Sequence, residues 1–214
     1  MTPARSSSPR PLREDHLGAS TFIEKGWNLI AQGDFKAAQA ALETALFLAP
    51  SEIRARSLLG WAQMRQGNYD EALATLDSVL AEDAMNGLAR ASLGYVCLRK
   101  GLLREAHDHL TRASHQVRDP KAALYGWFYL GIFHASQRDI VEAESCFQKT
   151  ISLAPNFIEA YYELGRSLFA AGEIESAHKT WRHGKAANRF NIWGRRCAEA
   201  VRLSLAGQEP RSFS

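Results

Sequence analysis

The chain has 214 residues, of which 46% are hydrophobic and 23% charged, and its formal net charge at pH 7 is +3. This balance fits one soluble helical domain, and no apolar run reaches the length of a membrane span. Its three cysteines have neither the paired spacing of a disulfide framework nor that of a zinc site. We therefore expect a reducing compartment, and a bacterial cytoplasm is our hypothesis.

The chain is expected to begin and end with disordered tails around one helical domain. Residues 1–14 are polar and basic and contain several Ser and Pro residues, which is typical of disorder rather than of a secretory signal. The domain is expected over residues 15–206. A second disordered tail is expected over residues 207–214.

Three series of residues recur through the domain at a nearly constant period. The first consists of glycines separated by 34, 34, 37 and 34 residues, namely Gly26, Gly60, Gly94, Gly131 and Gly165. The second consists of alanines, namely Ala38, Ala72, Ala106, Ala143 and Ala177. The third consists of large apolar residues, namely Leu42, Leu76, Leu110, Phe147 and Trp181. Small and large residues that recur together at this period indicate a stack of helical hairpins.

This pattern closely resembles the tetratricopeptide repeat family. The family's aromatic, Leu-Gly, Ala, aromatic and Pro positions are clearest in Trp127, Leu130, Gly131, Ala143, Phe147 and Pro155. The resemblance implies an all-α, right-handed solenoid of five hairpins, with a capping helix over residues 191–206. The repeats are expected over 19–52, 53–86, 87–120, 121–157 and 158–190. The family binds diverse partners, so the resemblance implies a scaffold and not an enzyme.

Local signals predict where individual helices begin and end. A glycine follows each of four expected helix ends, where the left-handed C-cap conformation favours it. Three pairs have capping-box spacing, namely Asn68 with Glu71, Asp139 with Glu142, and Asn156 with Glu159. The three-residue insertion before the fourth repeat contains Asp119-Pro120, which predicts an N-cap and a helix about one turn longer than its equivalents. The capping helix is expected to bury Ile192, Cys197, Val201 and Leu205.

In this family the first helix of each repeat forms a concave groove. Carried onto this chain, the resemblance assigns the groove to Ile23, Trp27, Arg54, Trp61, Met64, Arg65, Tyr95, Leu98, Arg99, Tyr125, Phe128, Ile132, Tyr162, Arg166 and Phe169. We interpret Trp27, Trp61 and Tyr95 as groove residues and not core, because all three follow the repeat glycine directly. Aromatic and arginine side chains often dominate binding energy. The expected ligand is therefore an apolar, partly acidic peptide or helix of a partner protein.

Other functions stay open as alternatives. The clamp that some co-chaperones of the family use to hold a C-terminal carboxylate is absent, because its Lys and Asn positions fall on Ile23, Trp27 and Leu58. A chaperone-like holder of a secreted or membrane client, similar to type III secretion chaperones, is one alternative.

A nucleic-acid-associated protein is the other alternative. It would use a basic patch of Lys179, Arg182, Lys185, Arg189, Arg195, Arg196 and Arg202, which could equally be a solvated end cap or meet an acidic protein. Contact with a membrane surface is expected only through a partner. No catalytic constellation, metal site or cofactor is expected, because the histidines have poor ligand spacing and the glycines belong to the repeat.

Overall fold

The computed structural model describes residues 18–116 and 118–210. Within these ranges the chain forms eleven helices and no strands. Ten of them pair as hairpins: α1 (Ala19–Gln32) with α2 (Phe35–Leu48), α3 (Ile53–Gln66) with α4 (Tyr69–Glu82), α5 (Gly87–Arg99) with α6 (Leu103–Ser114), α7 (Pro120–Ser136) with α8 (Ile140–Leu153), and α9 (Ile158–Ala170) with α10 (Ile174–Ala187). The eleventh, α11 (Ile192–Leu205), packs on α10 and α9.

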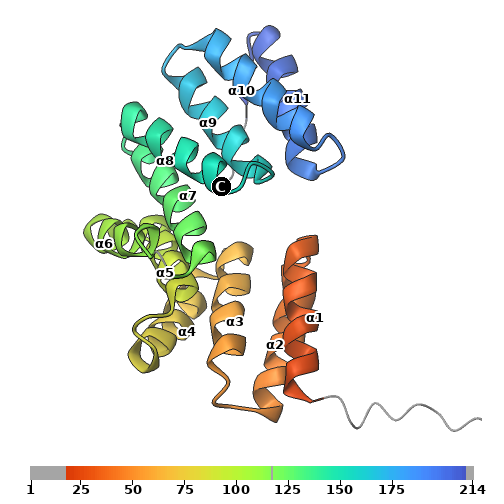
Figure 1. Cartoon of the computed structure of the whole chain (residues 1–214), viewed down its shortest axis with the longest axis vertical. Helices are drawn as coiled ribbons and strands as arrows, with labels where there is room; N and C mark the ends of the chain where they lie inside the picture. The colour runs from red at the N-terminus through yellow and green to blue at the C-terminus, as the bar shows by residue number, and fades with distance from the viewer. Residues whose placement is uncertain (1–17, 117, 211–214) are drawn as a thin grey trace, which may run out of the picture.

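The hairpins stack into a curved all-α solenoid, with α1 and α2 at one end and α9 to α11 at the other (Figure 1). Among the described residues, no helix combines the length and the apolarity needed to cross a membrane. The predicted tails fall mostly outside the described residues, which begin at Gly18 and end at Pro210, a buried residue. The repeat limits stay a prediction, and α7 begins one residue before the fourth repeat.

The periodic glycines and the periodic large residues face each other inside each hairpin. A β-carbon added at Gly60 would lie 2.6 Å from the Leu76 side chain, and one added at Gly165 would lie 2.3 Å from that of Trp181. The same pairing joins Gly26 to Leu42, Gly94 to Leu110, and Gly131 to Phe147. All five large side chains are fully buried. Each therefore packs directly on the glycine backbone, which sets the close approach of the two helices.

Some of the predicted helix ends are confirmed and others are wrong. Gly33 and Gly67 cap α1 and α3 with φ near +85°, as expected for the left-handed C-cap conformation. The capping boxes do not form: the Asn68 and Asp139 side chains make no cap hydrogen bond, and α9 is preceded by Phe157 in place of Asn156 as the N-cap. The first-turn N–H groups at such exposed ends can bond to water, so a side-chain cap is not required.

The longer helix before the fourth repeat glycine is confirmed. α7 has 17 residues, whereas the other first helices have 13 or 14. Asp119 is its N-cap, with the side chain accepting a hydrogen bond of 3.0 Å from Ala122 N, and Pro120 is its first residue. The extra turn lies at the N-terminal end, where Ala122 packs against Gly87 at the start of α5.

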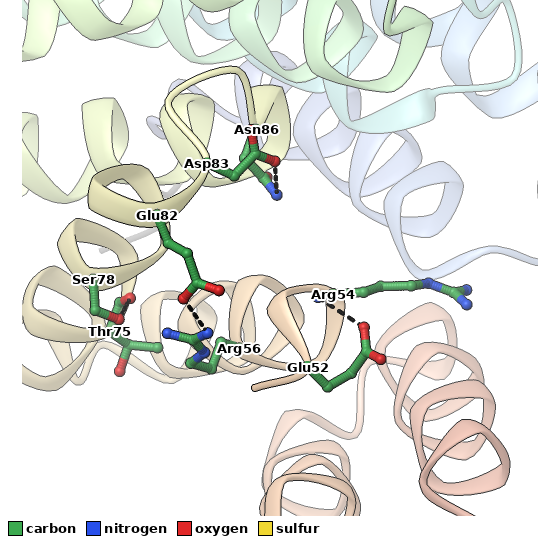
Figure 2. Close-up of polar contacts among 8 residues, drawn as sticks. All are labelled: Glu52, Arg54, Arg56, Thr75, Ser78, Glu82, Asp83 and Asn86. Atoms are coloured by element: carbon green, nitrogen blue, oxygen red, sulfur yellow. Dashed lines mark hydrogen bonds and ion pairs between the residues drawn. The ribbon is translucent and has the colours of Figure 1, made fainter. Parts of the chain in front are cut away.

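Arginines stand where the family pattern has its first aromatic in repeats two and three, and both make polar contacts. Arg56 on α3 is half-buried, and its Nη2 lies 2.5 Å from Glu82 Oε2 on α4 (Figure 2). Arg90 on α5 donates a hydrogen bond to the Ala84 carbonyl in the preceding loop. An ion pair therefore joins the two helices of the second repeat.

The capping helix α11 buries only part of its predicted face: Cys197 is buried and Val201 is half-buried against the core, but Ile192 and Leu205 are exposed. Gly194, Cys197 and Ala200 are buried, whereas Ile192 is 50% exposed and Leu205 is 71% exposed. The reason is the short distance between the helices: the Cys197 sulfur lies 2.9 Å from where a β-carbon on Gly184 of α10 would be. Only small side chains fit such a contact, so the large ones point elsewhere.

Candidate functional site

The concave face of the solenoid holds a cavity of about 1110 Å³. The C-terminal halves of α1, α3 and α5 form one wall, with α7 beside them, and α9 and the start of α11 form the opposite wall. Ten of the fifteen predicted groove residues line it, namely Trp27, Trp61, Met64, Arg65, Tyr95, Arg99, Tyr125, Phe128, Ile132 and Arg166.

The other five predicted groove residues lie outside the cavity lining. Ile23 and Tyr162 are core residues, each 4% exposed. Leu98 and Phe169 are half-buried and pack against the core. Arg54 is exposed, pairs with Glu24 at 2.8 Å, and extends away from the neighbouring Arg56–Glu82 pair (Figure 2). Ile23 and Arg54 lie near the N-terminal ends of α1 and α3, whereas the cavity contacts only the other halves of these helices.

Five aromatic rings form a continuous ladder across the concave face. Ring centroids are 6.0 Å apart for Trp27 and Trp61, 5.0 Å for Trp61 and Tyr125, 6.0 Å for Tyr125 and Tyr129, and 4.7 Å for Tyr129 and Tyr95. The Trp61 indole N–H donates to Tyr129 Oη at 3.4 Å. Repeat four therefore contacts repeats two and three through its tyrosines, and Trp61 links them to Trp27 of repeat one.

The ladder corrects the interpretation of Trp61. Its side chain is 4% exposed, because Tyr125 and Tyr129 cover it from α7, so it belongs to the core as well as to the cavity lining. Trp27 and Tyr95 are half-buried. Trp27 also contacts repeat four, because Lys121 in the extra turn of α7 places its Nζ 4.1 Å from the ring centroid, a cation–π contact.

Charged side chains complete the cavity. Arg65 on α3 reaches Glu159 on α9, with 3.6 Å between Nη1 and Oε2. Arg166 pairs with Glu163 on the same helix at 2.7 Å. Arg99 lies 5.1 Å from the Tyr69 ring centroid and donates a hydrogen bond to Tyr95 Oη at 3.1 Å, and within the described residues it has no acidic partner. Counting Arg195 and Arg196 of α11, five arginines and two glutamates line the cavity, which therefore carries net positive charge.

Burial alters the acids of this cavity. Desolvation raises the pKa of Glu163 to about 7, although Arg166 beside it favours the charged form. Desolvation also raises the pKa of Glu159, against the attraction of Arg65. The pKa of Tyr125 is raised to about 12 by the same cause, so its hydroxyl stays protonated at neutral pH. Near pH 7 the cavity therefore gains positive charge as pH falls.

Sequence reasoning missed several lining residues, and some of them left a signal. Glu159 and Glu163 are four residues apart on the first helix of repeat five, which places them on one helix face. Tyr129 likewise lies four residues after Tyr125, which was predicted to line the groove. Phe35 and Tyr69 begin second helices, so the family's groove positions gave no signal for them.

The predicted basic patch is not one surface, because helix periodicity turns its members to different sides of α10 and α11. Arg195 and Arg196 line the cavity, whereas Lys179 and Arg182 lie at a separate pocket on α10. Arg202 approaches Glu199 at 3.6 Å. The two remaining members, Lys185 and Arg189, are exposed.

Comparison with known proteins agrees with this architecture. A family model described as tetratricopeptide repeat matches residues 29–91. The chain is a tetratricopeptide repeat protein. Proteins of this family are typically non-enzymatic scaffolds for protein–protein interaction. A search of curated protein sequences gave no match.

Solved structures of tetratricopeptide repeat proteins share the fold. A thermophilic member from Thermus thermophilus is 21% identical, with a TM-score of 0.75 over 87% of this chain and 100% of that one. The pilF protein of Pseudomonas aeruginosa is 20% identical, with a TM-score of 0.63 over 88% and 87% of the two chains. YrrB, described as having an unusual peptide-binding site, is 21% identical, with a TM-score of 0.52 over 87% and 94%. At these identities the likeness concerns the fold alone.

Proposed function

We propose that this chain is a non-enzymatic adaptor that holds an apolar, partly acidic peptide or helix of a partner protein in its concave cavity. The observation that carries the proposal is one surface that joins an aromatic ladder to five arginines and only two glutamates. Aromatic and arginine side chains are the usual anchors of protein interfaces. A guanidinium without an acidic partner, such as that of Arg99, offers paired hydrogen bonds to a carboxylate.

The size of the cavity supports a peptide as the ligand. Pockets for small molecules have volumes of about 300–1,000 Å³, and this cavity, at about 1110 Å³, lies just above that range. A helix is about 10 Å across and rises about 1.5 Å per residue, so two to three turns would occupy roughly this volume. The description of the structural neighbour YrrB as a peptide-binding protein of the same fold adds support.

The alternatives receive less support. Of the seven basic residues proposed for nucleic acid, two line the cavity and two lie at a separate pocket on α10, so the seven do not form a continuous phosphate-binding surface. A chaperone-like holder would use the same cavity but would keep its client unfolded. We also propose a reducing compartment such as the cytoplasm, because Cys97, Cys146 and Cys197 are all buried free thiols.

Affinity capture from an extract of the native cells tests the proposal. The wild type is compared with Trp27→Ala/Arg99→Glu, which alters the cavity, and with Phe47→Ala/Arg104→Glu, which makes matching changes at exposed positions outside it. We expect the wild type and the outer variant to retain the same partner and the folded cavity variant to lose it. Equal capture by all three proteins would rule out the cavity as the binding site. Limited proteolysis of the captured partner separates an adaptor from a holder, because an unfolded client is cut rapidly.

A further inference from the structure

The two ion pairs of the cavity differ in the distance between their charged groups. Arg166 and Glu163 meet at 2.7 Å, the usual distance for a charge-assisted hydrogen bond, whereas Arg65 and Glu159 are separated by 3.6 Å. Both side chains of the longer pair are largely covered, with exposed fractions of 24% for Arg65 and 16% for Glu159. The longer pair also joins distant parts of the chain, since Arg65 lies in repeat two and Glu159 in repeat five.

Arg65 is held in place by more than Glu159. Its guanidinium lies 5.0 Å from the Phe35 ring centroid, and Tyr129 on α7 lies beside it and favours its charged form. The 3.6 Å between Arg65 and Glu159 is longer than a charge-assisted hydrogen bond, and the strength of such a pair depends on close geometry. A carboxylate that approached Arg65 at the usual distance would therefore bind better than Glu159 does.

We propose that Glu159 occupies the place of a carboxylate from the partner, and that binding exchanges one for the other on Arg65. This inference rests on the proposed function and names the group that the cavity recognises: an Asp or Glu side chain flanked by apolar residues. Charge complementarity favours this occupant, because arginines outnumber glutamates five to two in the lining. The aromatic ladder beside Arg65 would take the flanking apolar side chains.

The exchange should couple binding to uptake of a proton. The charged and titratable groups that face Glu159 are Arg65 on α3, Tyr125 and Tyr129 on α7, Glu163 on α9, and Arg196 on α11. Burial raises the pKa of Glu159 already when Arg65 is its partner. Once displaced, its carboxylate loses that attraction and takes a proton from solvent. Affinity should then weaken as pH rises, by up to about tenfold per pH unit above the pKa of Glu159 in the free protein.

Peptides selected on the full chain provide the probe. A displayed library of random peptides of about 12 residues, long enough for roughly three helical turns, is selected near neutral pH. The enriched sequences are synthesised with blocked ends, each beside a copy with Asn and Gln in place of Asp and Glu. Dissociation constants are then measured across about two pH units around neutrality, a span wide enough to resolve tenfold steps per unit. The proteins are the wild type, Glu159→Gln, Arg65→Gln, and the control Glu199→Gln, whose exposed carboxylate lies outside the cavity.

We expect the enriched peptides to contain Asp or Glu flanked by apolar residues, and we expect their neutral copies not to bind. At the alkaline end of the range, Glu159→Gln should bind about tenfold more tightly than the wild type and with less pH dependence, since nothing competes for Arg65 and no proton is taken up. Glu163, whose pKa of about 7 lies in the same range, would account for the remaining dependence. Arg65→Gln should bind at least about tenfold more weakly, and Glu199→Gln should match the wild type.

The other outcomes distinguish failure of the proposed exchange from failure of the proposed function. The exchange would be overturned if acidic peptides bound Glu159→Gln no more tightly than the wild type. It would also be overturned if the selected peptides were neutral or basic. In both cases the cavity would stand as the binding site. Peptides that bind Trp27→Ala/Arg99→Glu as well as the wild type would overturn the proposed function and the exchange together. If circular dichroism shows that Glu159→Gln does not fold, the wild type decides, because an affinity unchanged across the pH range contradicts proton uptake.

Discussion

Replacing Trp61 by Ala should lower the free energy of unfolding, because this ring is both part of the core and part of the cavity lining. The side chain is 4% exposed and contacts the rings of Trp27 and Tyr125, and its N–H reaches Tyr129 Oη. A tryptophan buries about 150–250 Å², and at about 25 cal/mol per Å² this corresponds to roughly 4–6 kcal/mol. Because alanine keeps a small part of this burial, we expect a loss of about 4 kcal/mol, within the usual range for such core truncations.

Urea unfolding followed by far-ultraviolet circular dichroism measures this loss. In thermal unfolding followed by the same signal, the melting temperature should fall by roughly 8–16 °C, since about 2–4 °C corresponds to each kcal/mol in a domain of this size. Trp61→Phe keeps an aromatic ring in place and should cost less, roughly 1–2 kcal/mol. A loss below about 1 kcal/mol for Trp61→Ala would show that Tyr125 and Tyr129 do not cover the ring, and the contacts described between repeats two and four would be refuted.

Three further predictions concern the hairpins and the buried acids. Gly60→Ala should lower the free energy of unfolding by about 1–3 kcal/mol in the same assay, because its β-carbon would lie 2.6 Å from Leu76; an unchanged value would contradict this packing. Asp119→Ala should cost about 1 kcal/mol through the lost N-cap, whereas Asn68→Ala, at an N-cap without a side-chain hydrogen bond, should cost less, so equal losses would argue against the assignment. The folded-state pKa of Glu163 is raised to about 7, so its contribution to the free energy of unfolding should be fully present below the unfolded pKa of about 4.5. This contribution should decrease by on the order of 3 kcal/mol as pH rises through 7. Glu163→Gln should flatten this part of the profile of unfolding free energy against pH, and a profile identical to that of the wild type would contradict the raised pKa.

The hairpins could be predicted from sequence because their determinants are local or repeat at a fixed spacing. Gly60 and Leu76 are near neighbours along the chain, and their counterparts recur in every repeat, so periodicity alone revealed them. The same holds for the extra turn of α7, where Asp119-Pro120 marks the start. The predicted capping boxes were wrong because the spacing of their residues allows side-chain hydrogen bonds but does not require them, since solvent can bond to the same N–H groups.

The cavity could be predicted only in part, because its shape depends on how far the solenoid curves. The groove positions of the family identified most of the lining on α3, α5 and α7, which follows the repeat. They could not show that Tyr129 covers Trp61, a contact between residues 68 positions apart. Nor could they bring Arg65 to Glu159, which requires repeats two and five to face each other across the superhelix. Such contacts are set by small rotations between repeats that add up along the stack.

Site-specific photo-crosslinking in the native cells tests the central claim, that the concave cavity is the partner-binding site. p-Benzoylphenylalanine is introduced in place of Tyr69, which lines the cavity, or in place of Leu103, which occupies the same position at the start of its second helix but lies outside the lining. Illumination should join a partner protein to the chain labelled at Tyr69 and not to the chain labelled at Leu103. Equal crosslinking from both positions, or crosslinking from Leu103 alone, would contradict the claim.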